Sequence, residues 1–160
     1  MAKHQVGIAL ARWFFVLLLA LSGCAKLFDL IGFFAVVATF DVLPGAMIPA
    51  FALGLALVEL GLAFWLACPS RINTTHEPQI AKLLQTPALY VLLLHSIYFA
   101  WLALAYARGL AVPNCGCFGV YWPRPLTEVT LIEDTLLIVV AALWLFGCIQ
   151  NVRNERFNML

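Results

Sequence analysis

Charged residues are scarce in this sequence. Only 11% of its 160 residues are Asp, Glu, Lys or Arg, whereas soluble domains usually carry about a quarter. A chain that is 64% hydrophobic lacks the polar surface that a water-soluble domain needs, so we expect lipid to be its solvent. The net charge of +1 gives no reason to expect nucleic acid as a partner.

Several sequence motifs are absent as well. No phosphate-binding glycine loop, internal repeat or low-complexity tract is present, which argues against a P-loop nucleotide enzyme and against a repeat protein. The length leaves no room for a separate soluble module, and we expect residues 1–160 to form a single transmembrane domain.

Four long apolar runs dominate what is present. They cover residues about 6–30, 46–67, 87–107 and 129–149. Each can cross about 30 Å of hydrocarbon as a helix, and helices satisfy their own backbone hydrogen bonds in lipid. We therefore predict an all-α fold, an integral membrane bundle of four transmembrane helices. Between the first two runs, residues 31–44 are expected to form an interfacial connection that is partly helical.

The first run also has the positive start and apolar centre of a signal peptide. Arg12 lies inside its first half, and no convincing cleavage site precedes Lys26. Both features favour a retained helix, so we count this run as the first transmembrane segment.

The basic residues predict the orientation of the bundle. If the four helices alternate in direction, the first side holds six of them and the second side three. The first set is Lys3, Arg12, Arg71, Lys82, Arg153 and Arg156, and the second is Lys26, Arg108 and Arg124. Because the basic side stays in the cytoplasm, we expect both termini on the cytoplasmic face of a bacterial inner membrane. Residues 108–127 then form a periplasmic or extracellular loop, in a compartment that permits disulfides.

This loop carries the sequence Asn114-Cys-Gly-Cys-Phe-Gly119, which we expect to present two accessible thiols. In one hypothesis Cys115 and Cys117 cycle between dithiol and disulfide, with Gly116 allowing the backbone to bend. A cramped bridge of this kind is strongly oxidising. In the alternatives the cysteines form a permanent structural bridge or bind a metal, for which the outer segments supply no histidine.

Depth along the helices divides the five cysteines into two sets. Cys24 is expected at the same outer level as the loop pair, where it could resolve a mixed disulfide or form the structural bridge. Cys68 and Cys148 are expected at the inner ends.

Two groups of polar residues accompany the apolar runs. Glu59 and His95 should lie at similar depth and form a buried polar pair, either a hydrogen bond that fixes helix packing or part of a proton path or quinone site. An outer-side charge cluster is expected to form ion pairs under the loop and to influence the thiols. Its members are Lys26, Arg108, Arg124, Glu133 and Asp134.

Small and aromatic residues also have predicted roles. Gly23, Gly54 and Gly61 are expected where helices approach one another closely. Tyr98 is expected to be an interface anchor or a packing residue.

The pattern Arg12 … Gly23-Cys-Ala-Lys26 … Glu59-Leu-Gly61 … Cys115-Gly-Cys-Phe-Gly119 … Asp134 resembles the MauE/DoxX-like redox-associated membrane proteins. MauE-type members are linked to maturation of methylamine dehydrogenase, and DoxX-type members to a thiosulfate:quinone oxidoreductase. The Cys-Gly-Cys-Phe-Gly loop matches the MauE side better. The resemblance implies a function in thiol redox or electron transfer at the membrane.

Two hypotheses about function follow. In the first, the protein is a thiol–disulfide oxidoreductase that serves a periplasmic redox protein or the maturation of a redox enzyme. In the second, it is a non-catalytic accessory subunit of a larger membrane electron-transfer complex, with its cysteines as a structural clamp. The sequence names no cofactor, and a quinone stays an open candidate.

Overall fold

The computed structural model describes residues 2–68 and 84–157, and within these ranges the regular structure is entirely helical. The elements are α1 (Ala2–Phe28), α2 (Leu30–Ala38), a 3₁₀ turn η1 (Gly45–Met47), α3 (Ile48–Ala67), α5 (Pro87–Ala107) and α6 (Glu128–Phe157). The all-α prediction is confirmed. Arg71 and Lys82, which enter the predicted charge asymmetry, lie outside the described residues.

Four of the helices are long and apolar enough to cross a membrane. The spans are Gln5–Phe28, Gly45–Ala67, Pro87–Ala107 and Glu128–Asn151, with mean hydropathies of 1.9 to 2.1. The chain is therefore a multi-pass membrane protein, as its composition predicts.

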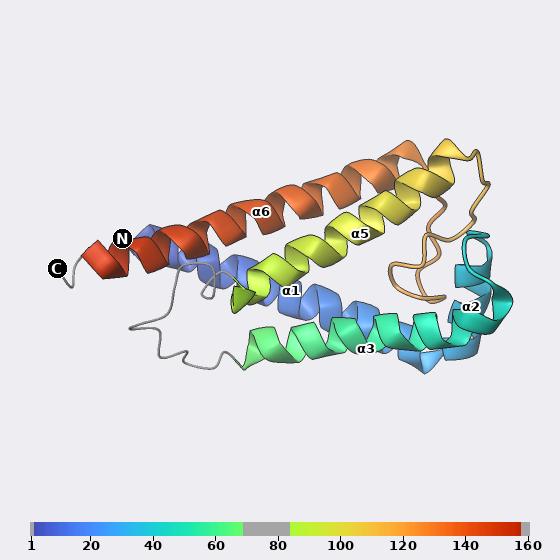
Figure 1. Ribbon diagram of the computed structural model, residues 1–160, viewed down its shortest axis with the longest axis horizontal. Helices are drawn as coiled ribbons and strands as arrows, with labels where there is room; N and C mark the ends of the chain where they lie inside the picture. The colour runs from blue at the N-terminus through green and yellow to red at the C-terminus, as the bar shows by residue number, and fades with distance from the viewer. Residues whose placement is uncertain (1, 69–83, 158–160) are drawn as a thin grey trace.

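The first connection is largely helical. Helix α1 ends at Phe28, and the Asp29 side chain accepts a hydrogen bond from the Gly32 backbone N–H at 2.8 Å, which caps the start of α2. Helices α3 and α5 each begin with a proline in the first turn, where no intrahelical N–H is needed. Because the chain breaks at Asp29, the short α2 lies at one end of the bundle instead of extending α1 (Figure 1).

The bundle consists of two helix pairs. Helix α1 packs chiefly on α3, and α5 chiefly on α6, with α1 also contacting α6. Figure 1 shows both termini at one end and, at the other, α2 beside residues 108–127. We call this second end the loop end. Residues 108–127 fold back between α5 and α2 instead of projecting away from the bundle.

Buried apolar side chains form two clusters. One, around Phe15, Leu66 and Trp144, holds the helices together towards the termini. The other, around Phe33, Phe40 and Val112, joins α2 and the loop to α3 and α5. The loop end therefore has a core of its own, and this core surrounds the candidate site.

The three glycines expected at close helix approaches do not behave alike. A Cβ at Gly23 would lie 2.8 Å from Leu60 Cγ, so α1 and α3 do approach closely there. At Gly54 and Gly61 a Cβ would meet no described atom within 4 Å. The expectation is correct for Gly23 and wrong for the other two, which face open space.

Candidate functional site

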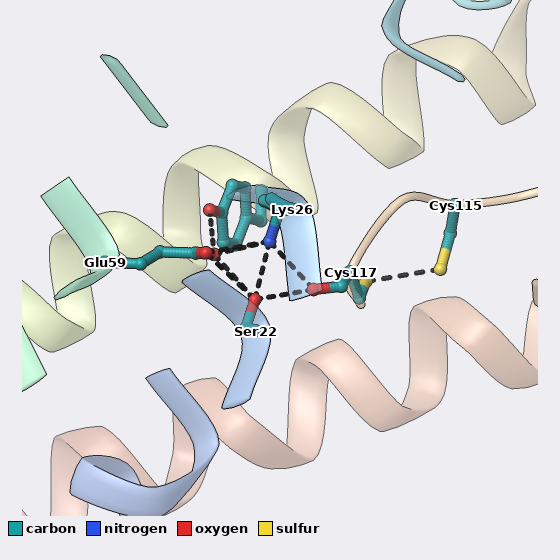
Figure 2. A network of polar contacts seen from close by, with 6 residues as sticks. Ser22, Lys26, Glu59, Cys115 and Cys117 are labelled. Carbon is teal, nitrogen blue, oxygen red and sulfur yellow. Dashed lines mark hydrogen bonds and ion pairs between the residues drawn. The ribbon is translucent and has the colours of Figure 1, made fainter. Parts of the chain in front are cut away.

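A buried ion pair joins α1 to α3. Lys26 lies near the end of α1 and Glu59 near the middle of α3, and each side chain is only 1% exposed. Lys26 Nζ lies 2.8 Å from both carboxylate oxygens of Glu59. Figure 2 shows the two side chains extending toward each other inside the bundle. Each charge supplies the compensation that the other needs in a low-dielectric setting.

Two hydroxyl groups complete the shell of the carboxylate. Ser22, one turn before Lys26 on α1, places Oγ 2.9 and 3.0 Å from the two Glu59 oxygens. Tyr98 on α5 donates a hydrogen bond from its hydroxyl to Glu59 Oε1. The network therefore draws on three spanning helices, and we call Ser22, Lys26, Glu59 and Tyr98 the polar network.

The polar network also holds the cysteine loop. Lys26 Nζ donates to the Cys117 carbonyl oxygen at 2.8 Å, and Ser22 Oγ lies 2.5 Å from the same oxygen. Ser22 has one hydroxyl proton, so at any moment it donates a hydrogen bond either to this carbonyl or to the Glu59 carboxylate. The backbone of the Cys-Gly-Cys motif is thus attached to buried charge without any disulfide (Figure 2).

Glycine and asparagine shape the loop itself. Gly116 and Gly119 have φ values of +80° and +60°, which side-chain-bearing residues rarely adopt. A Cβ at Gly119 would lie 3.1 Å from the Ala25 carbonyl oxygen, so the loop rests directly on α1. Asn114 bridges the turn, accepting from the Gly116 N–H at 3.0 Å and donating to the Gly119 carbonyl at 2.8 Å.

The two thiols are adjacent. Cys115 Sγ and Cys117 Sγ lie 3.2 Å apart, in hydrogen-bond contact. The expectation of an open, accessible pair is wrong for Cys115, which is 9% exposed, whereas Cys117 is half-buried. The reason is the attachment of the Cys117 carbonyl to Lys26, which draws the motif down into the bundle.

The environment separates the acidities of the two thiols. The hydrogen bond with Cys117 lowers the pKa of the Cys115 thiol to about 7, and the Cys117 backbone N–H and the Arg124 charge act in the same direction. The same hydrogen bond, followed by burial, raises the pKa of Cys117 well above its usual range. Cys115 is therefore the more acidic thiol and is partly ionised near neutral pH, whereas Cys117 stays protonated there.

A cavity of about 430 Å³ adjoins the pair. Its walls come from α2, α3 and α5, and its lining includes both cysteines, Gly116 and Lys26. The remaining lining residues are aliphatic or aromatic apart from Gly54. The sulfur atoms thus adjoin an apolar chamber inside the membrane protein.

The structure does not bring Cys24 into this site. Cys24 is exposed, whereas Ser22 and Lys26, two positions to either side, are buried. Residues two apart on an α-helix point to nearly opposite faces. Cys24 therefore lies on the lipid side of α1, and its expected part as resolving or bridging thiol receives no support from the geometry.

Glu59 and His95, the expected polar pair, form no hydrogen bond with each other. Both side chains are buried, but Glu59 is bonded to Ser22, Lys26 and Tyr98. His95 Nδ1 lies 2.9 Å from the Val91 carbonyl of its own helix, and the ring packs edge-on against Phe15. The pairing fails because the long Lys26 side chain reaches down to the carboxylate.

The outer-side charge cluster is divided among separate positions. Arg124 forms an ion pair with Glu133, and Arg108 lies 3.7 Å from Asp41 at the surface. Asp134 is 6% exposed, and among the described residues its Oδ2 has no hydrogen-bond partner. Lys26 belongs to the polar network instead.

Three residues of the site were not identified from the sequence as functional candidates. Ser22 could have been found, since residues four apart share a helix face and Ser22 precedes Lys26 by four. Tyrosine is a residue type common at membrane interfaces, so Tyr98 was predicted as an anchor. Asn114 belongs to the cysteine motif, but no role was predicted for it. No set of three or more metal-ligating side chains gathers within residues 2–68 and 84–157.

One family model matches most of the chain. The family model described as "Methylamine utilisation protein MauE" matches residues 5–147, a range that contains the polar network and both loop cysteines. Neither the curated proteins nor the solved structures include a match.

Proposed function

Because the chain belongs to the MauE family of methylamine utilisation proteins, we propose that it is a membrane thiol–disulfide redox protein whose working pair is Cys115 and Cys117. The observation that carries the proposal is the 3.2 Å separation of two sulfurs with divergent acidities, beside an apolar chamber. The family description supports methylamine utilisation as the process. We infer that the pair supplies disulfides during maturation of a redox enzyme outside the cytoplasm.

The geometry supports a defined order of thiol exchange. A partner thiolate attacks Cys117 Sγ of the oxidised pair, and Cys115 leaves as a thiolate. Cys115 is the better leaving group because its pKa is the lower of the two. A second partner thiolate then attacks the partner sulfur of the mixed disulfide and releases Cys117. The partner loses two electrons and two protons, and the pair gains both.

The same proposal includes the arrangement in the membrane. Residues 1–160 form one transmembrane domain with both termini in the cytoplasm, and the loop end faces the periplasm or the exterior. The asymmetry of basic residues supports this orientation, and disulfide chemistry requires the loop to face an oxidising compartment.

The alternative is an accessory subunit in which the cysteines only clamp the loop. The polar network weighs against it, because Lys26 and Ser22 already hold the Cys117 carbonyl while both sulfurs are thiols. A permanent bridge would therefore duplicate an attachment that exists without it.

A redox titration of the purified protein tests the proposal. The protein is equilibrated in thiol–disulfide buffers, its free thiols are alkylated, and the mass of the loop peptide is read. We expect Cys115 and Cys117 to change state together within the range of the buffers, and the transition to disappear in Cys115→Ser and in Cys117→Ser. The matched control Cys24→Ser retains it. A bridge that resists reduction until the protein is denatured would favour the accessory role.

A further inference from the structure

The cavity beside the thiols has buried and exposed lining residues. Lys26 and Cys115 are 1% and 9% exposed, and Lys26 belongs to the polar network. Val58 on α3 and Ile97 on α5 also line the cavity, yet they are 50% and 61% exposed. Both lie within membrane spans, so a mouth opens between α3 and α5 into lipid. A molecule dissolved in the bilayer can enter without crossing a polar barrier.

The walls of the cavity suit a flat aromatic ring. Phe51 and Trp101, which both line it, are stacked with ring centroids 5.3 Å apart. The lining also includes Phe33, Phe40 and Tyr98. Aromatic side chains favour offset stacking on other ring systems. The volume of about 430 Å³ falls in the range of about 300–1,000 Å³ in which proteins hold small organic ligands.

The charges at the cavity favour a neutral ligand. Lys26 is the only Lys, Arg, Asp or Glu in the described lining, and Glu59 compensates it at 2.8 Å. An anionic cofactor would find no unpaired cation there, and a cation would be repelled by Lys26. The ligand that fits is an uncharged, ring-shaped and lipid-soluble molecule.

The thiol pair also requires an oxidant after each exchange. Each partner disulfide that is made leaves Cys115 and Cys117 as a dithiol, which must lose two electrons and two protons before the next cycle. A quinone accepts the same numbers, dissolves in lipid, and is a neutral planar ring. We propose that the cavity binds a membrane quinone and that this quinone reoxidises Cys115 and Cys117. The inference rests on the proposed thiol-exchange function and names the final electron acceptor.

The step balances in atoms and electrons. Oxidation of the pair breaks two S–H bonds and forms the Cys115–Cys117 S–S bond. The two electrons and two protons that are released convert the quinone to a hydroquinone, in which two new O–H bonds form. The hydroquinone leaves by the same mouth into the bilayer. No further co-reactant is needed.

A pair of glycine variants on α3 tests the site. Gly54 lines the cavity and Gly61 does not, while both have open space where a Cβ would lie. Gly54→Leu therefore fills the cavity, and Gly61→Leu makes the same change of residue on the same helix outside it. The dithiol form of each protein is mixed in micelles with decylubiquinone, a benzoquinone with a short alkyl tail. Quinone absorbance and thiol alkylation are followed together.

We expect wild type and Gly61→Leu to consume one equivalent of quinone while the dithiol becomes a disulfide. In Gly54→Leu the half-saturating quinone concentration rises by about tenfold or more, because the added side chain takes up cavity volume that the quinone would fill. Oxidised glutathione, a charged disulfide that the apolar cavity excludes, oxidises all three proteins at similar rates.

Three results would overturn the inference. The first is oxidation of Gly54→Leu by quinone with the same concentration dependence as wild type, which would mean that the cavity is not the binding site. The second is reaction of wild type with oxidised glutathione but not with quinone, as expected if the cavity holds only lipid acyl chains. That result leaves the proposed thiol exchange standing. The third is reaction with neither oxidant, which removes the proposed function as well.

Discussion

At the scale of single residues, the Lys26–Glu59 ion pair dominates the energetics. Both side chains are 1% exposed, so each charge depends on the other for compensation. The carboxylate also accepts from Tyr98 and Ser22, which makes the arrangement more than a single contact. Removal of either charge leaves its partner buried and uncompensated.

We expect Lys26→Met to lower the free energy of unfolding by about 3–5 kcal/mol, the usual cost of an orphaned buried charge. Equilibrium unfolding in mixed micelles measures the loss. The matched control is Arg108→Met, which removes a cation from a surface pair with Asp41 whose side chains are 38% and 87% exposed. A pair of that kind contributes no more than about 1 kcal/mol.

A double variant, Lys26→Met with Glu59→Leu, separates charge from packing. It should recover much of the stability lost in Lys26→Met, because no buried charge remains without a partner. If the double variant is as unstable as the single one, the loss came from side-chain volume and not from the ion pair.

The thiols give a second prediction at this scale, for the pH dependence of alkylation. Cys115 is protonated and unreactive below its pKa and a reactive thiolate above it. Its reaction with a neutral, membrane-permeant maleimide should rise through a midpoint near pH 7. In Cys117→Ala the midpoint moves upward toward the ordinary value of about 8.5, since the hydrogen bond that lowers the pKa most is lost. An unchanged midpoint in Cys117→Ala would contradict the assigned cause, and Cys24→Ser serves as the control.

The sequence identifies the reactive residues better than it identifies their partners. Cys115 and Cys117 stand out by spacing alone, and Glu59 by being charged in an apolar run. The partner of Glu59 is missed because depth arguments place each residue at the level of its Cα. A lysine side chain extends well beyond that level, so Lys26 reaches into the bundle from the end of its helix.

At the scale of elements, the position of the loop depends on its glycines. Gly119 lies against α1, where a Cβ would be 3.1 Å from the Ala25 carbonyl oxygen. Gly109 has a similar φ of +69°, but a Cβ there would meet no described atom within 4 Å. Alanine substitutions at the two positions therefore distinguish the effect of backbone strain from that of steric contact.

Gly109→Ala should cost about 1–2 kcal/mol, the penalty for a left-handed residue with a side chain. Gly119→Ala should cost more and should lift the loop from α1. We expect a membrane-impermeant thiol reagent to label Cys117 faster in Gly119→Ala than in wild type or Gly109→Ala. Equal labelling in all three proteins would show that the contact with Ala25 does not hold the loop down.

Helices are predictable at this scale and their contacts are not. Apolar runs of membrane-spanning length and the prolines that begin α3 and α5 are visible in the sequence. Glycine in a membrane helix signals close approach only when a neighbouring helix faces it. Gly23 faces Leu60, whereas Gly54 faces the cavity, and composition does not distinguish the two.

At the scale of the whole molecule, composition predicts the membrane bundle, and the basic residues predict its orientation. The inward fold of residues 108–127 is not predictable in this way, because it depends on a contact between Lys26 and a backbone carbonyl. Every residue type has a backbone carbonyl, so the identity of residue 117 does not reveal this contact.

The orientation is tested with single cysteines in intact cells. Cys68 lies at the end of α3 away from the loop end, and Tyr121 lies in the loop and is 63% exposed. In a background without other cysteines, we expect an impermeant maleimide to label Tyr121→Cys from outside and to leave Cys68 unlabelled until the cells are opened. The opposite pattern would place the loop in the reducing cytoplasm, where disulfide exchange by this pair has no basis.

The hydrogen bonds that hold the Cys117 carbonyl join parts of the chain that leave the ribosome far apart in time. Ser22 and Lys26 precede Cys117 by 95 and 91 residues. At about 5–20 residues per second, that interval lasts roughly 5–20 s. Glu59 follows Lys26 by only 33 residues, so α1 and α3 can pair first and form a receptor for the later loop. Newly made chains therefore pass through a stage in which both sulfurs are still outside the bundle and lack the surroundings that set their acidities.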